Sequence, residues 1–210
     1  MPAKLSAKTE IEIKLRIANL RRVLPLIRQI GAVPRGRVFE QNILFDTPDS
    51  GFWRHGRLLR LRVQTPALGN GSRGGPRAAT LTAKAPPSSR RAATGRKTPF
   101  KERLESELTV KMPARWPLVL EALGFRAGFI YQKYRTSFGL RGLHVDLDET
   151  PVGIFLELEG NPAAIRRTAG DLGFAPKEYI RATYWDLYVA DCRRLKRAPR
   201  NMVFKSQKFR

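Results

Sequence analysis

Alternating polar and apolar residues run through most of the chain and predict a protein built mainly of β-strands. Residues 9–17 (TEIEIKLRI) alternate strictly, with the period of two that is typical of a strand. Seven further segments have strand-like patterns: 37–46, 57–63, 78–85, 101–110, 131–140, 143–149 and 153–160. Eight candidate strands with few helices favour an antiparallel barrel or sandwich.

Helical patterns occur only as separators between these strands. They cover residues 19–31, 114–123, 161–172 and 181–195. The first begins with Asn19 as a predicted cap and stops at Gly31, and its Pro25 is expected to kink the helix or delay its start. The fold class is therefore α+β, and we expect one domain over residues 1–195.

The charged residues of the predicted strands fall on one face. Side chains at i, i+2 and i+4 share a face, so Glu10, Glu12 and Lys14 lie opposite the apolar residues between them. Equivalent rows recur in six of the seven other strands: Arg60/Arg62, Thr80/Thr82/Lys84, Arg103/Glu105/Glu107, Lys133/Arg135, Asp146/Asp148 and Phe155/Glu157/Glu159. One such row would be an ordinary solvent-facing surface. Because seven strands repeat it, we interpret the rows as the polar interior of a closed sheet, whose charges must be paired or occupied.

The two signs of charge in these rows predict what occupies the interior. Clustered Lys and Arg neutralise phosphate oxygens. Clustered Asp and Glu without Cys or His suit a hard cation, Mg²⁺ or Mn²⁺, which prefers oxygen ligands. Several positive groups around one ligand favour a triphosphate over a monophosphate. His55 and His144 are interpreted as surface or turn residues, since neither has a second His at ligand spacing.

Composition adds a strongly basic character that is unevenly distributed. The formal net charge is +22, and residues 66–103 carry nine Lys or Arg against one Glu. Within them, 66–77 and 86–99 are predicted to be mobile loops, because they are rich in Gly, Pro and Ser. Residues 196–210 are predicted to be a basic, disordered tail. Such segments attract polyanions, so contact with RNA or polyphosphate is one expectation.

The remaining composition points to a reducing compartment. Cys192 is the single cysteine, which excludes an internal disulfide. The first residues lack the apolar core of a secretory signal, and no apolar run reaches the length of a membrane span. We expect a cytoplasmic protein without membrane insertion, and a homodimer is left open.

The ordered motifs resemble those of the CYTH superfamily, the triphosphate tunnel metalloenzymes. Glu10-Ile-Glu12-Ile-Lys14 is similar to the family's ExExK signature, and Leu59-Arg60-Leu-Arg62 to its paired basic motif. The other matching segments are Gln41-Asn-Ile-Leu-Phe-Asp46-Thr, Thr80-Leu-Thr-Ala-Lys84, Arg103-Leu-Glu105-Ser-Glu107, Lys133-Tyr-Arg135, Asp146-Leu-Asp148, Gly153-Ile-Phe-Leu-Glu157-Leu-Glu159-Gly and Ala182-Thr-Tyr184-Trp-Asp-Leu187. In the last one Thr183 replaces the family's serine. The resemblance spans residues 8–190.

The resemblance implies an eight-stranded antiparallel tunnel that binds triphosphates with Mg²⁺ or Mn²⁺. The predicted metal ligands are Glu10, Glu12, Asp146, Glu157 and Glu159. The predicted phosphate-binding residues are Lys14, Arg60, Arg62, Lys84, Arg103, Lys133 and Arg135. Glu12, Lys14 and Asp146 are the predicted catalytic residues, with Asp146 at a second metal or positioning the attacking group. Glu105 and Glu107 bind metal or orient Arg103.

Three functions remain open at this point. The first is hydrolysis of inorganic triphosphate or of a nucleoside or other organic triphosphate, and the second is a class IV adenylyl cyclase that makes cyclic AMP from ATP. The third is a non-catalytic binder of polyanions. Two residues also have two interpretations each: Trp53 plugs a barrel end or stacks on a base, and Asp46 orients a basic residue or caps a turn.

Overall fold

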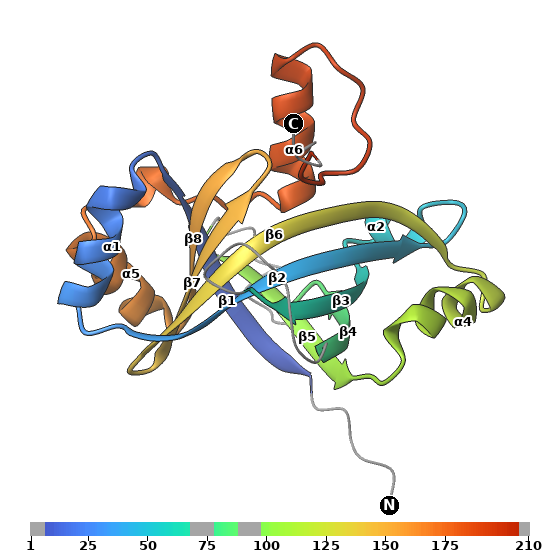
Figure 1. The fold of residues 1–210 in the computed structure, drawn as a ribbon, viewed down its shortest axis with the longest axis horizontal. Helices are drawn as coiled ribbons and strands as arrows, with labels where there is room; N and C mark the ends of the chain where they lie inside the picture. Colours follow the sequence, from blue (N-terminus) through green and yellow to red (C-terminus); the bar gives the residue numbers. More distant parts are fainter. Residues whose placement is uncertain (1–6, 68–77, 88–97, 206–210) are drawn as a thin grey trace, which may run out of the picture.

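Eight antiparallel strands close into a barrel in the computed structural model, which describes residues 7–67, 78–87 and 98–205 (Figure 1). The strand order is β1-β5-β4-β3-β2-β6-β7-β8, and β8 pairs with β1 to complete the ring. The bounds are β1 (Lys8–Ile17), β2 (Val33–Asp46), β3 (Leu58–Pro66), β4 (Ala78–Ala85), β5 (Lys101–Thr109), β6 (Arg126–Leu140), β7 (Leu143–Thr150) and β8 (Gly153–Gly160). The predicted fold class is confirmed.

The strand register brings the charged rows to the same side of the wall. Between β1 and β8, Glu12 lies opposite Glu159 and Lys14 lies opposite Glu157. Between β1 and β5, Glu10 lies opposite Arg103. Directly opposed residues point to the same face of a sheet, so the rows join across strand boundaries and line the interior of the barrel.

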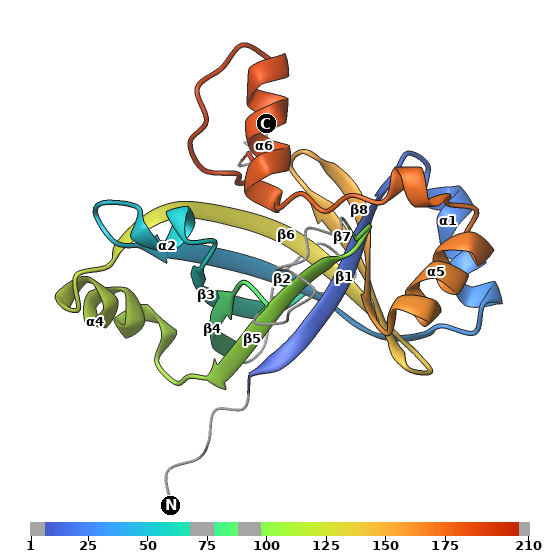
Figure 2. The same ribbon diagram turned by 180° about the vertical axis from the view of Figure 1, so that it is seen from behind.

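The apolar core lies outside the barrel, between the outer face of the sheet and the helices. Helices α1 (Leu20–Gln29) and α5 (Pro162–Asp171) lie side by side against one end of it (Figures 1 and 2). The cluster beneath them contains Leu15, Val145 and Leu158, which are fully buried. Helix α1 begins directly after its Asn19 cap and runs through Pro25, so the proline does not delay its start.

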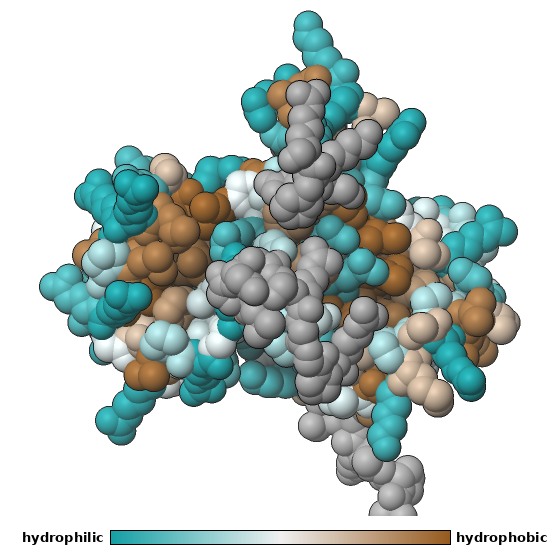
Figure 3. Space-filling view, in the orientation of Figure 1, coloured by the Kyte–Doolittle hydropathy of each residue, from teal (hydrophilic) through white to brown (hydrophobic). Residues whose placement is uncertain are grey.

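A second apolar cluster covers the opposite end of the barrel. Phe45, Leu61 and Leu120 belong to it, and Leu120 lies on α4 (Trp116–Ala122), which follows the 3-10 turn η1 (Pro113–Arg115). The short helix α2 (Gly51–Arg54), which the sequence pattern did not predict, packs Phe52 here. Apolar side chains remain visible on the surface around α4 (Figure 3), where Leu118 and Leu123 are exposed.

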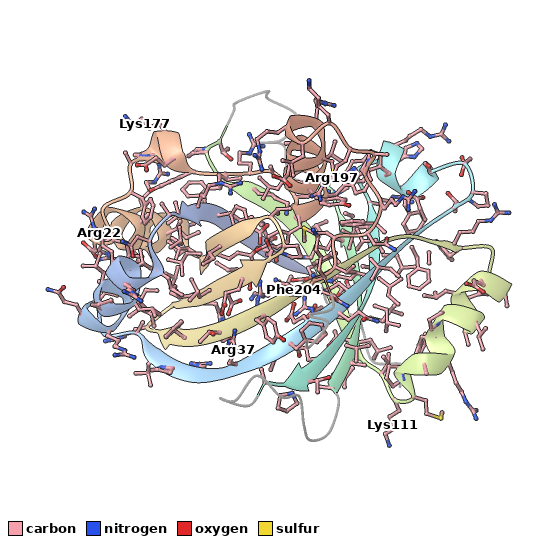
Figure 4. All side chains as sticks on the ribbon, turned by 45° about the horizontal axis from the view of Figure 1, so that its top comes forward. Arg22, Arg37, Lys111, Lys177, Arg197 and Phe204 are labelled. Atoms are coloured by element: carbon pink, nitrogen blue, oxygen red, sulfur yellow. The ribbon has the colours of Figure 1, made fainter. Side chains whose placement is uncertain are left out.

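The C-terminal segment corrects one prediction. Helix α6 (Tyr184–Arg194), preceded by the 3-10 turn η2 (Pro176–Glu178), is followed by residues 197–205, named here the C-terminal strap. The strap is placed against β6 rather than disordered: Met202 N donates to Ile130 O, and Gln132 N donates to Met202 O, both at 2.9 Å. Phe204 packs its ring 5.4 Å from that of Tyr134 (Figure 4).

The strap is ordered because β6 offers it an open edge. Strand β7 pairs with β6 only from Tyr134 onward, so the backbone groups near Tyr131 need other partners. Met202 fills the adjoining apolar space beside Phe129 and Tyr188 and is only 1% exposed. The basic residues around Met202 and Phe204 led to the prediction of disorder, although these two apolar side chains anchor the strap. Residues 206–210, and 68–77 and 88–97 of the predicted mobile loops, lie outside the described residues.

Candidate active site

The barrel encloses a cavity of about 720 Å³, referred to below as the tunnel. Every residue predicted for the site lines it: Glu10, Glu12, Lys14, Arg60, Arg62, Lys84, Arg103, Glu105, Glu107, Lys133, Arg135, Asp146, Glu157 and Glu159. Their charges are largely buried, so water screens them little and each needs a partner or a ligand. The chemistry of the tunnel therefore depends on which charges already satisfy one another.

Asp148 is the centre of the most complete network. Its carboxylate, fully buried on β7, accepts hydrogen bonds from Lys133 Nζ at 2.7 Å and from Arg135 Nε at 2.7 Å. It also accepts one from the Tyr184 hydroxyl at 2.6 Å. Burial, followed by the negative charges of Asp148 and Glu157, raises the pKa of Tyr184. The phenol therefore stays protonated as a donor, and Asp148 fixes two bases toward the tunnel.

Arg135 is held from three directions. Its guanidinium contacts Asp146 at 2.8 Å as well as Asp148, and it also pairs with Glu157. Asp146 also accepts a hydrogen bond from Ser137 Oγ at 2.6 Å. Burial opposes the charge of Arg135, but these carboxylates outweigh it and raise its pKa further. Arg135 is thus a fixed cation with a defined orientation.

Lys14 lies between two carboxylates where the barrel closes. Its ammonium group is 3.0 Å from Glu12 and 3.1 Å from Glu157. Burial would raise the pKa of Glu12, yet Lys14 and Lys101 outweigh it and hold that pKa well below its usual range. The pKa of Glu157 is lowered in the same sense by Lys14 and Lys133 against the effect of burial. Both carboxylates are therefore ionised at neutral pH.

Glu10 lies two residues before Glu12 on β1, and its pKa is shifted in the opposite direction. Lys84 Nζ donates to it at 2.6 Å and is shared with Glu105 at 3.0 Å. Burial and then the charge of Glu12 nevertheless raise the pKa of Glu10, and Glu105 adds to this. The pKa of Lys101 is lowered by burial and by Lys14, although Glu12 accepts its hydrogen bond at 2.6 Å. Like charges thus crowd this part of the wall.

Arg60 and Arg62 retain unused donors. Arg60 donates to the Tyr131 hydroxyl and to Thr82 Oγ1, both at 3.3 Å, and Glu107 lies 3.6 Å from each guanidinium. The Nε groups of both arginines are buried without a hydrogen-bond partner among the described residues. A buried N–H without a partner is costly, so a bound anion or water would stabilise this side of the tunnel.

Arg103 and Asp46 organise one mouth of the tunnel. Arg103 donates to the carbonyl oxygen of Gly56, which has a positive φ of 63°. Asp46 accepts from the backbone N of Thr47 at 2.7 Å, of Phe52 at 2.9 Å and of Trp53 at 3.0 Å. Of the two interpretations of Asp46, the structure supports the turn cap. It places α2 at the end of the barrel.

Comparison with known families decides what kind of domain this is. The model of the CYTH domain matches residues 8–172. The chain belongs to the CYTH family. Because that match covers most of the chain and the barrel is closed as the family implies, family membership supports a triphosphate-binding tunnel. Among curated proteins, none matches this sequence.

Solved structures share the fold at low sequence identity. The PH1819 protein of Pyrococcus horikoshii OT3 has a TM-score of 0.69 at 22% identity, covering 87% of this chain and 99% of its own. A Vibrio parahaemolyticus protein described as a "putative adenylate cyclase" has a TM-score of 0.67 at 18% identity, covering 87% and 98%. A Hippeastrum protein, a "putative adenylyl cyclase" described as having a dominant triphosphatase activity, has a TM-score of 0.56 at 16% identity, covering 90% and 97%.

Several residues that line this CYTH tunnel, or that contact its lining residues, were given no role from the sequence. Glu40 is fully buried on β2, 3.5 Å from Lys133 and 4.0 Å from Arg62, and these bases with Arg135 outweigh burial and lower its pKa. Lys101 and Tyr131 continue the rows of Arg103 and Lys133, so parity alone would have found both. Asp148 was predicted to share a face with Asp146, but no function was predicted for it. Tyr184 begins a helix, where no alternation marks it.

The oxygen atoms that could bind a metal ion in this CYTH tunnel belong to carboxylates of β1 and β8. Carboxylate oxygens of Glu10, Glu12, Glu157 and Glu159 come from the paired strands β1 and β8, and oxygen is what Mg²⁺ or Mn²⁺ prefers. Within the described residues, no three His, Cys, Asp or Glu side chains converge to form a metal site, because Lys14, Lys84 and Lys101 contact these acids. The donors fit a hard cation in kind.

Along the described stretches of the chain, no helix combines the length and the apolar character that crossing a bilayer requires.

Proposed function

We propose that this CYTH protein is a cytoplasmic enzyme that hydrolyses the terminal phosphoanhydride bond of a triphosphate in the presence of Mg²⁺ or Mn²⁺. The observation that carries the proposal is the tunnel itself, in which bases from β1, β3, β4, β5 and β6 converge between carboxylates. A highly charged anion matches that set of bases. A binder of polyanions alone would gain nothing from the acids, which oppose phosphate.

The bases bind and stabilise the phosphates. Arg60 and Arg62 offer their unused Nε donors, and Lys133 and Arg135 are held in place by Asp148. Because these groups are fixed before the reaction, they stabilise charge that develops on the phosphate oxygens without reorganising. Lys14 and Lys84 neutralise the remaining phosphate charge.

The carboxylates of β1 and β8 would hold the cation, with Glu10, Glu12, Glu157 and Glu159 as ligands. A bound Mg²⁺ or Mn²⁺ neutralises phosphate charge and makes a nearby water more acidic. Asp146, which contacts Arg135 at 2.8 Å and accepts a hydrogen bond from Ser137, orients the attacking water toward the terminal phosphorus. The products are orthophosphate and a diphosphate.

The second candidate function is cyclisation of ATP, the activity named for the Vibrio neighbour. It would use the same bases and cation, with the ribose hydroxyl attacking the α-phosphorus. The two reactions differ in their products, so one assay separates them.

The test incubates the purified full chain with Mg²⁺ or Mn²⁺ and, separately, inorganic triphosphate, ATP and thiamine triphosphate in ¹⁸O-labelled water. Hydrolysis places ¹⁸O in the released orthophosphate, which ³¹P NMR detects. Cyclic AMP and unlabelled diphosphate from ATP would indicate the cyclase instead. Glu157→Gln should lower kcat/KM by about 100-fold or more, since a fixed electrostatic group is lost.

A matched control lies on the outer face of the barrel. Glu149→Gln removes a carboxylate that pairs with Arg37 at 2.8 Å and does not line the tunnel, so it should keep the activity within about twofold. Absence of turnover with every substrate, together with polyphosphate binding that survives Glu10→Gln and Glu12→Gln, would overturn the proposal in favour of a polyanion binder.

A further inference from the structure

A β-bulge at the start of β2 gives one arginine a direction that strand alternation does not predict. Pro34 lies opposite Phe138 of β6 and Gly36 lies opposite Ser137, so Arg35 is an extra residue without a cross-strand partner on β6. Pro34 has no backbone N–H to donate, and Gly36 has a φ of 141°, which favours glycine. Bulges redirect side chains and are common next to active sites. The local sequence thus favours a bulge that turns Arg35 out of the regular alternation.

The guanidinium of Arg35 lies over Gly139, near the end of β6. Alternation beyond Arg135 and Ser137 places residue 139 on the face that lines the tunnel. A Cβ atom at residue 139 would lie 2.6 Å from Nη2 and 2.8 Å from Cζ of Arg35, too close for either to stay in place. The guanidinium can therefore occupy this position only because residue 139 is a glycine. Arg35 supplies, from β2, the side chain that β6 lacks there.

Arg35 lines the tunnel without a partner of its own. In the ranges that the structure describes, its side chain makes neither an ion pair nor a hydrogen bond. Glu159, an acid that also lines the tunnel, is instead engaged by Lys8, whose Nζ lies 3.5 Å away. A guanidinium presents its N–H groups in a planar fork that matches phosphate oxygens. The donors of Arg35 are thus available to an anion at this end of the tunnel.

His144 of β7 adjoins the Arg35 guanidinium. It lies directly opposite Gly139 on β6 and Glu159 on β8, so its side chain points to the same face, and it lines the tunnel. The sequence analysis interpreted His144 as a surface or turn residue. It is exposed, but at the rim of the tunnel. An imidazole N–H is a hydrogen-bond donor, so a second donor to an anion lies beside Arg35.

The position of Arg35 is separate from that of the buried bases. Gly139 follows Arg135 by four residues on β6, or about 13 Å at the usual rise of a strand. Arg135 is held among Asp146, Asp148 and Glu157. A phosphate group bound by Arg35 is therefore a different one from the group that Arg135 binds.

We propose that Arg35 and His144 form a second phosphate subsite, which takes a single phosphate group in addition to the triphosphate. The inference rests on the proposed function and deepens it. Gly139 is the positioning residue, because it makes room for the guanidinium. Two sources share this ligand chemistry: the orthophosphate that hydrolysis releases, and the outermost group of a linear polyphosphate longer than triphosphate.

The first experiment fills the triphosphate site of the purified full chain with the bis-methylene analogue of triphosphate, which is not hydrolysed, in the presence of Mg²⁺. Isothermal titration calorimetry then measures Kd for inorganic phosphate. Arg35→Gln should raise this Kd by about tenfold or more, the scale of a lost hydrogen bond to a charged group. Gly139→Ala keeps Arg35 but displaces its guanidinium, so a similar rise is expected.

The matched control is Arg37→Gln on the same strand. The Arg37 guanidinium pairs with Glu149 at 2.8 Å and lies over the ring of Tyr134, and it does not line the tunnel. Its loss should change the Kd for phosphate by less than about twofold, because an exposed charge contributes little. An unchanged Kd in both Arg35→Gln and Gly139→Ala, or an equal rise in Arg37→Gln, would overturn the inference.

Steady-state kinetics separates the two sources of the phosphate group. For released orthophosphate, Arg35→Gln weakens product inhibition by phosphate and leaves KM for triphosphate unchanged. For a longer chain, Arg35→Gln raises KM for linear tetraphosphate relative to KM for triphosphate.

Failure of the subsite and failure of the proposed function give different results. Hydrolysis of triphosphate with phosphate binding that is independent of Arg35 would overturn the inference and leave the proposed function standing. Phosphate binding that depends on Arg35, without hydrolysis of any triphosphate, would support the subsite and contradict the proposed function. The comparison of Kd for phosphate among the variants holds even where the analogue does not bind.

Discussion

Two walls of the tunnel contain the same kinds of charged residue but shift their pKa values in opposite directions. On the β6–β7 wall, Asp148 and its neighbours alternate in sign, and the pKa values of Lys133 and Arg135 are raised because acids outweigh burial and, at Lys133, also the repulsion of Arg135. On the β1–β5 wall like charges adjoin. Burial and Glu12 raise the pKa of Glu10, and burial and Lys14 lower that of Lys101.

The two walls therefore differ in role: the β6–β7 wall is a fixed framework, and the β1–β5 wall is the one on which a ligand would change the charge balance. The β6–β7 wall is electrostatically complete without a ligand, so its bases are already oriented for phosphate. The β1–β5 wall is also paired, with Lys84 on Glu10 and Lys101 on Glu12, but burial and like-charged neighbours still oppose the charges of Glu10 and Lys101. A ligand that binds only the folded state stabilises it through the usual linkage of ligand and folding.

The largest effect is expected on the complete wall. Asp148→Asn removes a fully buried charge that holds Lys133, Arg135 and the Tyr184 hydroxyl. Breaking a buried ion pair from one side leaves the other charge uncompensated and costs about 3–5 kcal/mol. We expect the free energy of unfolding in urea to fall by that amount. A loss below about 1 kcal/mol would show that the wall is not the framework described.

An intermediate effect is expected at Glu12, which lies on β1 and contacts both Lys14 and Lys101. Glu12→Gln removes the charge between Lys14 and Lys101, which lie 3.0 Å and 2.6 Å away, while Lys14 keeps Glu157. Because one partner remains, the loss should be about 1–3 kcal/mol, the range for hydrogen bonds to charged groups. Denaturant titration without divalent cations measures it. A gain in stability would contradict the assignment of Glu12 to paired charge.

The smallest effect, of opposite sign, is expected at Glu10. Glu10→Gln removes a carboxylate whose ionisation burial and two neighbouring acids oppose, so without divalent cations stability at neutral pH should stay within about 1 kcal/mol or rise. A folded pKa above the unfolded one means that the group stabilises the fold at low pH and loses this contribution as pH rises through the folded value.

The pH dependence supplies the check on that prediction. From near the ordinary pKa of 4.5 upward, the unchanged protein should lose stability relative to Glu10→Gln until the raised pKa has been passed. Urea titrations of both proteins at several pH values, with a chelator present, measure the difference. A difference that grows in favour of Glu10 as pH rises would mean that Lys84 dominates its environment.

The fold and most of the site follow from residue parity, and the exceptions have physical causes. Glu10, Arg60 and Lys133 line the tunnel as parity predicts, because side chains alternate between the two faces of a strand whichever strand pairs with it. Tyr184 could not be found this way, since it reaches Asp148 from the start of a helix. Strand β6 begins at Arg126, five residues before its predicted start, and Met202 belongs to a short apolar run, 202–204, inside a basic tail. Both depend on partners distant in the sequence.

The position of β1 in the barrel has a consequence for how the chain folds. This first strand is hydrogen bonded to β5 and β8, whose segments begin at Lys101 and Gly153. During synthesis it must therefore wait for most of the chain before either edge is satisfied, with Ile13 and Leu15 unburied meanwhile. Contacts so distant in sequence are slow to form. Closure of the ring by β1 is thus the expected rate-limiting step, and the interval before it is when the chain is most exposed to aggregation.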